Sequence, residues 1–405
     1  MAESEIGDVA LEEIEEEEQV GEAVNSALSK DEEIENQFGE QPFRVVYQTN
    51  NFLLPQIRDL ILEGDVVNLR PEYQRRLRWT GTQKSLLIES LLLNVPVPPL
   101  FFFENDLARY EVMDGQQRLN AIKEFLEGDF PLRGLTVLST LNGRRYTRLP
   151  PRIKRSLDRA SVQAIVVLQE SQGRLKKAGT TRHYELRRFV FERLNTGGRK
   201  LNAQEIRNAV YGSNFNELIT TLSRNSVFTR IWGIPAYTAA DPNEYYEEPD
   251  RQKNNLYRTM ADCQIVLRFF ALRDQSLIQG SMRSILDKCM ERSLDLSKEE
   301  CENLGNEFVE RLELADELFD KKPFELELYG RTRPSVGVYD GIMIALDRLW
   351  DHKEDITKAK SKIQKRYSQL IKSEGNTGRL TGSANTSQDV KDRLSLFENM
   401  IVGAL

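Results

Sequence analysis

The sequence contains very little histidine and cysteine. Of its 405 residues, two are histidine and three are cysteine. His183 and His352 belong to no H-E-x-x-H or H-x-E pattern, which argues against a histidine-rich metal hydrolase and a zinc deaminase. The odd number of cysteines, without a C-x-x-C pair, indicates neither a disulfide framework nor a thiolate metal cluster. We expect these three thiols to be small buried side chains.

Other common motifs are also missing. The sequence has no G-x-x-x-x-G-K-[ST], which excludes a Walker-type nucleotide site, and no G-x-S-x-G elbow that would support a serine hydrolase. No apolar run reaches the roughly 18 residues of a membrane-spanning helix, and the first residues are acidic where a signal peptide would be basic. These absences predict a cytoplasmic protein with no membrane partner.

The negative net charge comes from one segment. Residues 1–40 contain fifteen acidic side chains and one basic side chain, Lys30, a balance of −14. Because the whole chain has a net charge of −7, the remainder is positive by +7. Residues 1–40 have no aromatic residue before Phe38, which is typical of a disordered acidic tail. Such a tail is either a solvated extension or a competitor of nucleic acid for a basic surface.

The patterns after the tail predict an α+β fold, with a small mixed α/β domain at 41–212 and a mainly helical domain at 213–405. For the first domain we expect helices at 54–61, 82–94, 151–159 and 184–194, strands at 66–69 and 162–168, a hairpin of 100–104 with 109–113, and a second hairpin of 135–138 with 144–147. A further helix has Arg118 in its first turn, apolar residues at 119, 122, 125 and 126, and Gly128 as its stop signal. For the second we expect helices at 255–272, 281–292, 298–319, 335–351, 355–373 and 387–401. Asn202 with Glu205 and Ser297 with Glu300 have the form of capping boxes.

The segment Asp114-Gly115-Gln116-Gln117-Arg118 joins a predicted strand to a predicted helix. A helix N-terminus offers backbone N–H groups and the positive end of the helix dipole, so anions bind there readily. Arg118 adds a planar set of donors suited to phosphate oxygens. Asp114 would repel a bare phosphate, and a role toward Mg²⁺ or a ribose hydroxyl suits it better. On these residues alone, the alternative is an ordinary Asp-Gly turn with exposed amides and a surface arginine.

Four motifs in order resemble one known family. They are Tyr73-Gln74-Arg75 followed by Trp79; residues 87–93 with Pro96-Val97-Pro98; Asp114 to Leu119; and Phe191 to Asn195 with Gly197-Gly198, Leu201 and residues 205–209. Together they resemble the N-terminal domain family of GmrSD-type restriction endonucleases, which is similar to the ParB/sulfiredoxin superfamily. The resemblance covers about residues 50–212.

The resemblance implies a module that binds, and in some members hydrolyses, a nucleoside triphosphate with Mg²⁺ in a restriction or anti-phage system acting on DNA. It assigns Asp114, Gly115, Gln116, Gln117 and Arg118 to nucleotide binding, with Tyr73, Gln74 and Arg75 facing the same pocket. Asp114 and Arg118 would be catalytic, and Asp114 or Glu72 would hold the metal or orient water. The identity of the nucleotide stays open.

The C-terminal half departs from such enzymes. A His-Asn-His nuclease module needs a histidine base, and neither histidine has suitable neighbours, so we expect a stand-alone form whose cutting activity belongs to a partner nuclease. Two alternatives stay open: a DNA-binding or regulatory switch without nucleotide turnover, and a nuclease activity of the ParB-like domain itself. The switch is favoured by a basic run, which comprises Arg144, Arg145, Arg148, Arg152, Lys154 and Arg155.

Overall fold

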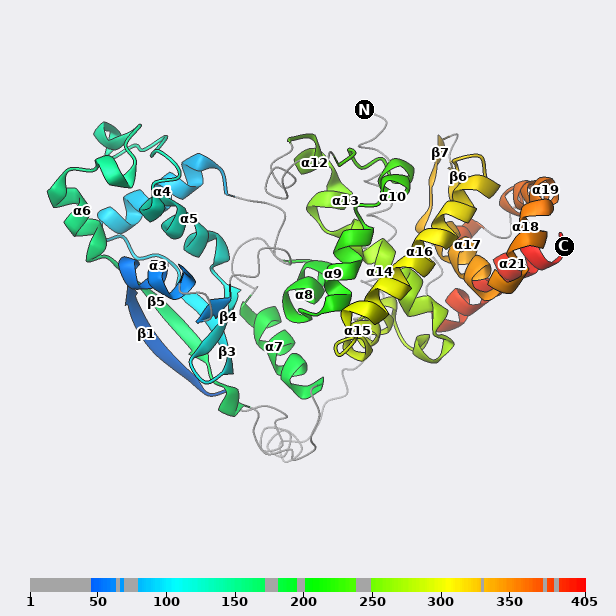
Figure 1. The fold of residues 1–405 in the computed structure, drawn as a ribbon, viewed down its shortest axis with the longest axis horizontal. Helices are drawn as coiled ribbons and strands as arrows, with labels where there is room; N and C mark the ends of the chain where they lie inside the picture. The colour runs from blue at the N-terminus through cyan, green and yellow to red at the C-terminus, as the bar shows by residue number, and fades with distance from the viewer. Residues whose placement is uncertain are drawn as a thin grey trace, which may run out of the picture. The chain divides into compact units, whose positions relative to one another are not determined.

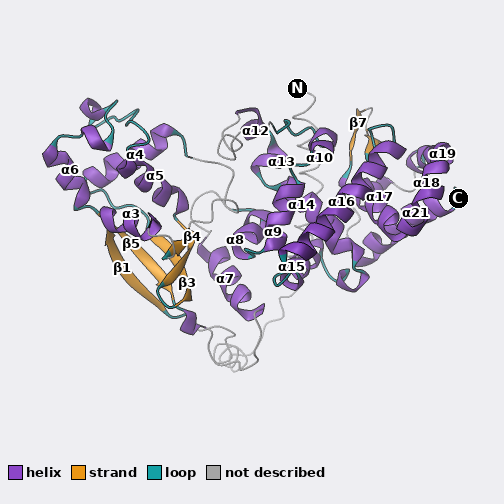
Figure 2. Ribbon diagram, viewed as in Figure 1, coloured by secondary structure: helices purple, strands orange, loops and turns teal. Residues whose placement is uncertain are grey.

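The computed structural model describes residues 45–62, 66–68, 79–171, 181–194, 201–237, 249–328, 331–373, 377–381 and 386–405. The fold is α+β, as the sequence predicted (Figures 1 and 2). Contacts divide the chain into two compact units that meet between Lys200 and Leu201. The predicted acidic tail, residues 172–180, and Asn195 and Gly197 of the fourth motif lie outside the described residues.

The first unit is built on a five-stranded mixed sheet with the order β1-β5-β3-β4-β2. The expected hairpin is confirmed: β3 and β4 are antiparallel neighbours, while β3 pairs with β5 and β2 with β4 in parallel. β1 pairs antiparallel with β5 and was not predicted, because its sequence YQTNNFL is mostly polar. The strands are β1 (Tyr47–Leu53), β2 (Val67–Asn68), β3 (Leu100–Asp106), β4 (Arg109–Asp114) and β5 (Ser161–Val167).

Helices cover both faces of this sheet. Side chains alternate between the faces of a strand, so neighbouring residues of β3 face opposite ways. Phe102 belongs to the main apolar core of the unit, whereas Phe103 lies under the guanidinium of Arg187 from α7. The core side is covered by a group of four helices (Figure 1). These are α3 (Leu54–Leu62), α4 (Gly81–Leu92), α5 (Gln116–Glu127) and α6 (Pro151–Asp158), and α7 spans Thr181–Leu194.

The second predicted hairpin is wrong. In place of strands at 135–138 and 144–147, the chain forms the short 3-10 helices η1 (Ser139–Leu141) and η2 (Tyr146–Arg148). Gly143 does make a tight turn, with φ of +82°. The Asn142 amide bonds to both the N–H and the carbonyl of Leu135, so a side chain occupies backbone groups that a strand ladder would need. A third 3-10 helix, η3, spans Gln169–Ser171.

The second unit is mainly helical, and it also contains a hairpin, β6 (Glu325–Leu328) with β7 (Arg331–Pro334), that the sequence did not predict. Both predicted capping boxes are present, at Asn202 with Glu205 and at Ser297 with Glu300. The helices are α8 (Ala203–Val210), α9 (Asn214–Leu222), α10 (Ser226–Ile231), α12 (Pro249–Lys253), α13 (Asn255–Arg258), α14 (Ala261–Arg273), η4 (Gln275–Leu277), α15 (Met282–Arg292), α16 (Lys298–Leu318), α17 (Val336–Arg348), η5 (Trp350–His352), α18 (Lys353–Lys358), α19 (Lys360–Ile371), α20 (Thr377–Leu380) and α21 (Ser387–Val402).

Two predicted helices are interrupted. The helix expected at 255–272 breaks at Met260, whose φ of +59° is left-handed, and the one at 355–373 breaks at Ala359. The expectation for the cysteines is confirmed, since all three are buried and none forms a disulfide. Burial raises the pKa of the Cys289 thiol to about 12, so it stays protonated. Within the described ranges, none of the helices combines the length and the apolarity needed to span a bilayer.

Candidate functional site

The predicted turn lies where the sequence placed it, between a strand and a helix of the first unit. β4 ends at Asp114, Gly115 occupies the N-cap position with φ of +98°, and α5 begins at Gln116. The helix ends twelve residues later at Gly128, which is again left-handed, with φ of +85°. Gly115 has no side chain with which to cap this helix end. A helix N-terminus of this kind presents backbone N–H groups and the positive end of the helix dipole, which attract anions.

Gly115 is required at this position for two reasons. Its φ of +98° is in the left-handed region that other residues avoid. A Cβ atom here would also lie 2.4 Å from Leu100 Cδ2 and 3.0 Å from Arg118 Nη2. The guanidinium of Arg118 thus packs directly against the backbone of the turn, and any larger residue would displace it.

Arg118 and Asp114 form an ion pair, with 2.8 Å between Nη2 and Oδ2. The same nitrogen donates to the Pro99 carbonyl at 3.2 Å, at the start of β3. The two partners differ in burial, since the Arg118 side chain is 12 % exposed and that of Asp114 is 56 % exposed. The Nε atom of Arg118 is buried and has no hydrogen-bond partner in the described part of the chain. The arginine therefore has a fixed position and an unused donor.

The two glutamines of the motif point in different directions. Gln116 is buried, with 5 % of its surface exposed. Gln117 Oε1 accepts a hydrogen bond of 3.2 Å from the backbone N–H of Trp79, two residues before α4. Gln117 thus ties the entry to α4 to the first turn of α5.

Four other predicted site residues, Glu72, Tyr73, Gln74 and Arg75, lie outside the described residues. The chain on each side of them is joined to the turn. On one side β2 pairs with β4, the strand that ends at Asp114. On the other side Trp79 donates to Gln117.

A buried ion pair beside the turn was not predicted. Glu111 of β4 is 3 % exposed, and its Oε1 atom lies 2.5 Å from Nη2 of Arg187, which is 5 % exposed. Asn105 donates to the other carboxylate oxygen at 2.8 Å. A glutamate inside the apolar strand 110–113 is the sequence feature that could have indicated a buried partner, but the partner follows 76 residues later, beyond any local pattern. The pair holds α7 against the strand that delivers Asp114.

Comparison with known families gives a match that covers most of this unit and continues into the first helix of the second. Residues 57–212 match the model of the GmrSD restriction endonuclease, N-terminal domain. This domain belongs to that family. The match includes the turn, the ion pair of Glu111 with Arg187, and the capped helix α8. A search of curated proteins and a search of solved structures each gave no match.

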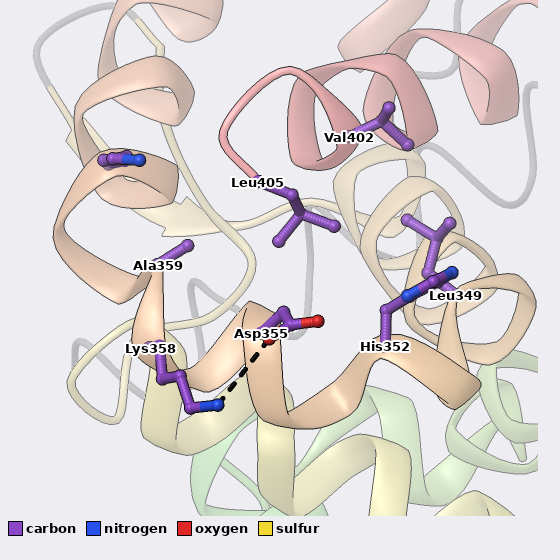
Figure 3. A pocket seen from close by; sticks show the side chains of 8 residues that line it. Leu349, His352, Asp355, Lys358, Ala359, Val402 and Leu405 are labelled. Atoms are coloured by element: carbon purple, nitrogen blue, oxygen red, sulfur yellow. Dashed lines mark ion pairs between the residues drawn. The ribbon is translucent and has the colours of Figure 1, made fainter.

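The second unit contains cavities that are separate from the turn of the GmrSD N-terminal domain. One, of about 500 Å³, lies between η5, α18 and the end of α21, with an apolar side of Leu349, Val402 and Leu405 (Figure 3). His352 and Asp355 border it, and Asp355 is paired with Lys358 at 3.6 Å. Another cavity, of about 530 Å³, is bordered by Trp350. Neither is lined by a residue of the Asp114–Arg118 turn.

Proposed function

We propose that this protein is a component of a restriction or anti-phage defence system, and that its GmrSD N-terminal domain binds a nucleoside triphosphate at the turn from Asp114 to Arg118. The family supports the first part, since it is that of a restriction endonuclease domain. The observation that supports the second is the guanidinium of Arg118, which packs against Gly115 and whose Nε has no hydrogen-bond partner among the described residues.

The phosphates would bind at the N-terminus of α5. This end has the positive end of the helix dipole, and its N-cap residue, Gly115, has no side chain. Arg118, in the first turn, adds a charge whose position is set by the Pro99 carbonyl and by contact with the turn. A cation that is already ordered loses little entropy when an anion binds, so it contributes more than a mobile side chain.

Asp114 suits a metal that arrives together with the nucleotide. Within the described residues, no group of three or more His, Cys, Asp or Glu side chains could hold a metal. Mg²⁺ commonly uses one or two carboxylates, with phosphate oxygens and water completing its shell, and it would neutralise phosphate charge. The exposed carboxylate of Asp114 fits this limited role. Binding would then exchange the internal ion pair for two others, one from Arg118 to phosphate and one from Asp114 to the metal.

Hydrolysis needs a further group to orient water, and Glu72 is our candidate for it. Binding without turnover, as in a regulatory switch, is the second candidate function. It is favoured by the geometry of the turn itself, where Gln116 is buried, Gln117 holds Trp79 and Asp114 is paired with Arg118. None of these side chains is placed as a general base in the described arrangement.

The test is to measure binding and hydrolysis of each nucleoside triphosphate by the full chain, with and without Mg²⁺ and DNA. Arg118→Ala should lower nucleotide affinity by roughly tenfold or more, because charge-assisted hydrogen bonds contribute about 1.5–3 kcal/mol. Arg133→Ala is the matched control, since this arginine is exposed in the same unit. Equal binding by wild type and Arg118→Ala would refute the assignment of the turn. Binding without hydrolysis would select the switch.

A further inference from the structure

We propose that a second surface of the first unit, formed by η2 and α6, binds the phosphate backbone of double-stranded DNA. Its residues are the exposed arginines 144, 148, 152, 155 and 159. This surface is separate from the nucleotide turn, and its test needs no nucleotide.

The arginines of α6 share one side of the helix. Arg152, Arg155 and Arg159 are spaced by three and four residues, the spacing that places side chains on one face. All three are exposed, whereas Leu157 on the opposite face is fully buried in the core of the unit. From Arg152 to Arg159 the stripe extends about 10 Å, at a rise of about 1.5 Å per residue.

The segment that carries this surface has a strong excess of positive charge. Residues 144–159 contain six arginines and Lys154, against the single carboxylate of Asp158, which leaves +6. Asp158 accepts a hydrogen bond of 2.6 Å from the Tyr146 hydroxyl. In the described part of the protein, none of the five exposed arginines forms an ion pair. Clustered like charges repel one another and destabilise a folded chain. An external polyanion that binds these arginines would relieve the repulsion.

Two of the cations in this segment have structural contacts, which distinguishes them from the other five. Arg145 Nη1 donates to the Gly128 carbonyl at 2.6 Å, at the C-terminal end of α5. Lys154 Nζ lies 4.4 Å from the centre of the Tyr146 ring. These contacts hold η2 against α5 and α6. The remaining arginines therefore extend from a backbone that is held in place.

The form of the surface favours a duplex over a single strand. Proteins that bind single strands present aromatic rings on which bases stack. Here the one aromatic ring of the segment, Tyr146, is half-buried and covered by Lys154. Along each strand a duplex carries one phosphate per roughly 3.4 Å of its axis, so a stripe of about 10 Å can follow about three phosphates of one strand. Contacts of this kind position a protein on DNA without reading its sequence.

The surface and the turn lie at opposite ends of α5. The turn is at its N-terminus, and the bond from Arg145 to Gly128 is at its C-terminus, twelve residues and about 18 Å away. Substitutions in the stripe should therefore leave nucleotide binding unchanged, and Arg118→Ala should leave DNA binding in the absence of nucleotide unchanged. Failure of one proposal can thus be told apart from failure of the other.

The experiment measures binding of a labelled DNA duplex of mixed sequence to the full chain by anisotropy over a series of salt concentrations. The test variant combines Arg152→Gln, Arg155→Gln and Arg159→Gln. The matched control combines Lys365→Gln, Lys372→Gln and Lys391→Gln, which removes the same charge from exposed sites in the second unit. Because the substituted side chains are exposed, both variants should unfold at the wild-type temperature.

We expect the stripe variant to bind at least roughly tenfold more weakly, and the slope of log K against log salt to fall by about three, close to one for each lost phosphate contact. The control should bind like wild type. Equal weakening in both variants, or none in either, would overturn the proposal. So would tighter binding of an RNA duplex or of poly-glutamate than of DNA with the same dependence on the stripe.

Discussion

Arg118 and Asp114 form an ion pair in which the cation is mostly buried and the anion is exposed. This difference in burial determines which of the two residues can exchange its partner. Arg118 is held by the Pro99 carbonyl and by contact with Gly115, while more than half of the Asp114 side chain faces solvent. Asp114 can therefore exchange partners while the arginine stays in place.

Asp114→Asn tests this exchange. Without Mg²⁺ the carboxylate competes with phosphate for Arg118, so its removal should tighten nucleotide binding by a few-fold, in line with about 0.2–1 kcal/mol for such exposed pairs. Addition of Mg²⁺ should no longer raise the affinity. Titration calorimetry with and without a chelator measures both effects. The control Glu127→Gln removes an exposed carboxylate from the other end of α5 and should keep the full response to Mg²⁺. A full Mg²⁺ response in Asp114→Asn would contradict the metal role.

Gly115→Ala should destabilise the first unit by roughly 2–5 kcal/mol, because left-handed strain costs about 1–2 kcal/mol and overpacking about 1–3 kcal/mol. Gly143→Ala is the control, since its φ is +82° but no atom lies within 4 Å of an added Cβ. That variant should lose only the conformational part, about 1–2 kcal/mol. Urea unfolding of both variants gives the comparison. Equal losses of stability would mean that the Leu100 side chain moves to accommodate the added methyl group without a further cost.

Asp340→Ala should be the most destabilising change in the second unit. Asp340 accepts from Arg268 Nε at 2.9 Å and lies 3.5 Å from Arg393 Nη2, and all three side chains are fully buried. Removing the carboxylate leaves two buried guanidiniums without it, which costs about 3–5 kcal/mol. Lys358→Ala removes an exposed pair with Asp355 and should change stability by less than about 1 kcal/mol. Chemical unfolding would refute the prediction if the two losses were similar.

Tyr146 should lose its proton at an unusually high pH. Burial, and then the hydrogen bond to Asp158, raises its pKa to about 12 from an ordinary value of 10.0. Because the folded pKa is the higher one, the group's contribution to stability is complete below pH 10 and is lost as the pH rises through about 12. The difference in tyrosinate absorbance between wild type and Tyr146→Phe isolates this group. A midpoint near pH 10 would show that Tyr146 is solvated in the folded protein.

Local chemistry made much of the fold predictable. Glycines at both ends of α5 and the capping boxes at Asn202 and Ser297 specify helix ends through neighbouring residues alone, and each was predicted from sequence. The errors arose where a side chain competed with the backbone or where pairing is distant. Asn142 turned an expected hairpin into 3-10 helices, and the polar β1 exists because β5, more than a hundred residues away, pairs with it.

The site was predictable to the same extent. The positions of Gly115 and Arg118 follow from the strand, turn and helix pattern, and the structure places them in contact. The groups that hold the turn in place cannot be predicted from that pattern. The Pro99 carbonyl, the Trp79 amide and the salt bridge of Arg187 to Glu111 come from other elements, and only tertiary packing brings them to the turn.

The two left-handed glycines at the ends of α5 also fix how those ends are rotated relative to each other about the helix axis. Each successive residue of an α-helix rotates by about 100°, so one inserted or deleted residue would turn the Gly128 end, where Arg145 is bonded, by that angle relative to Arg118. No single change in length restores both the angle and the distance. We therefore expect the twelve-residue length of this helix to tolerate substitution far better than insertion.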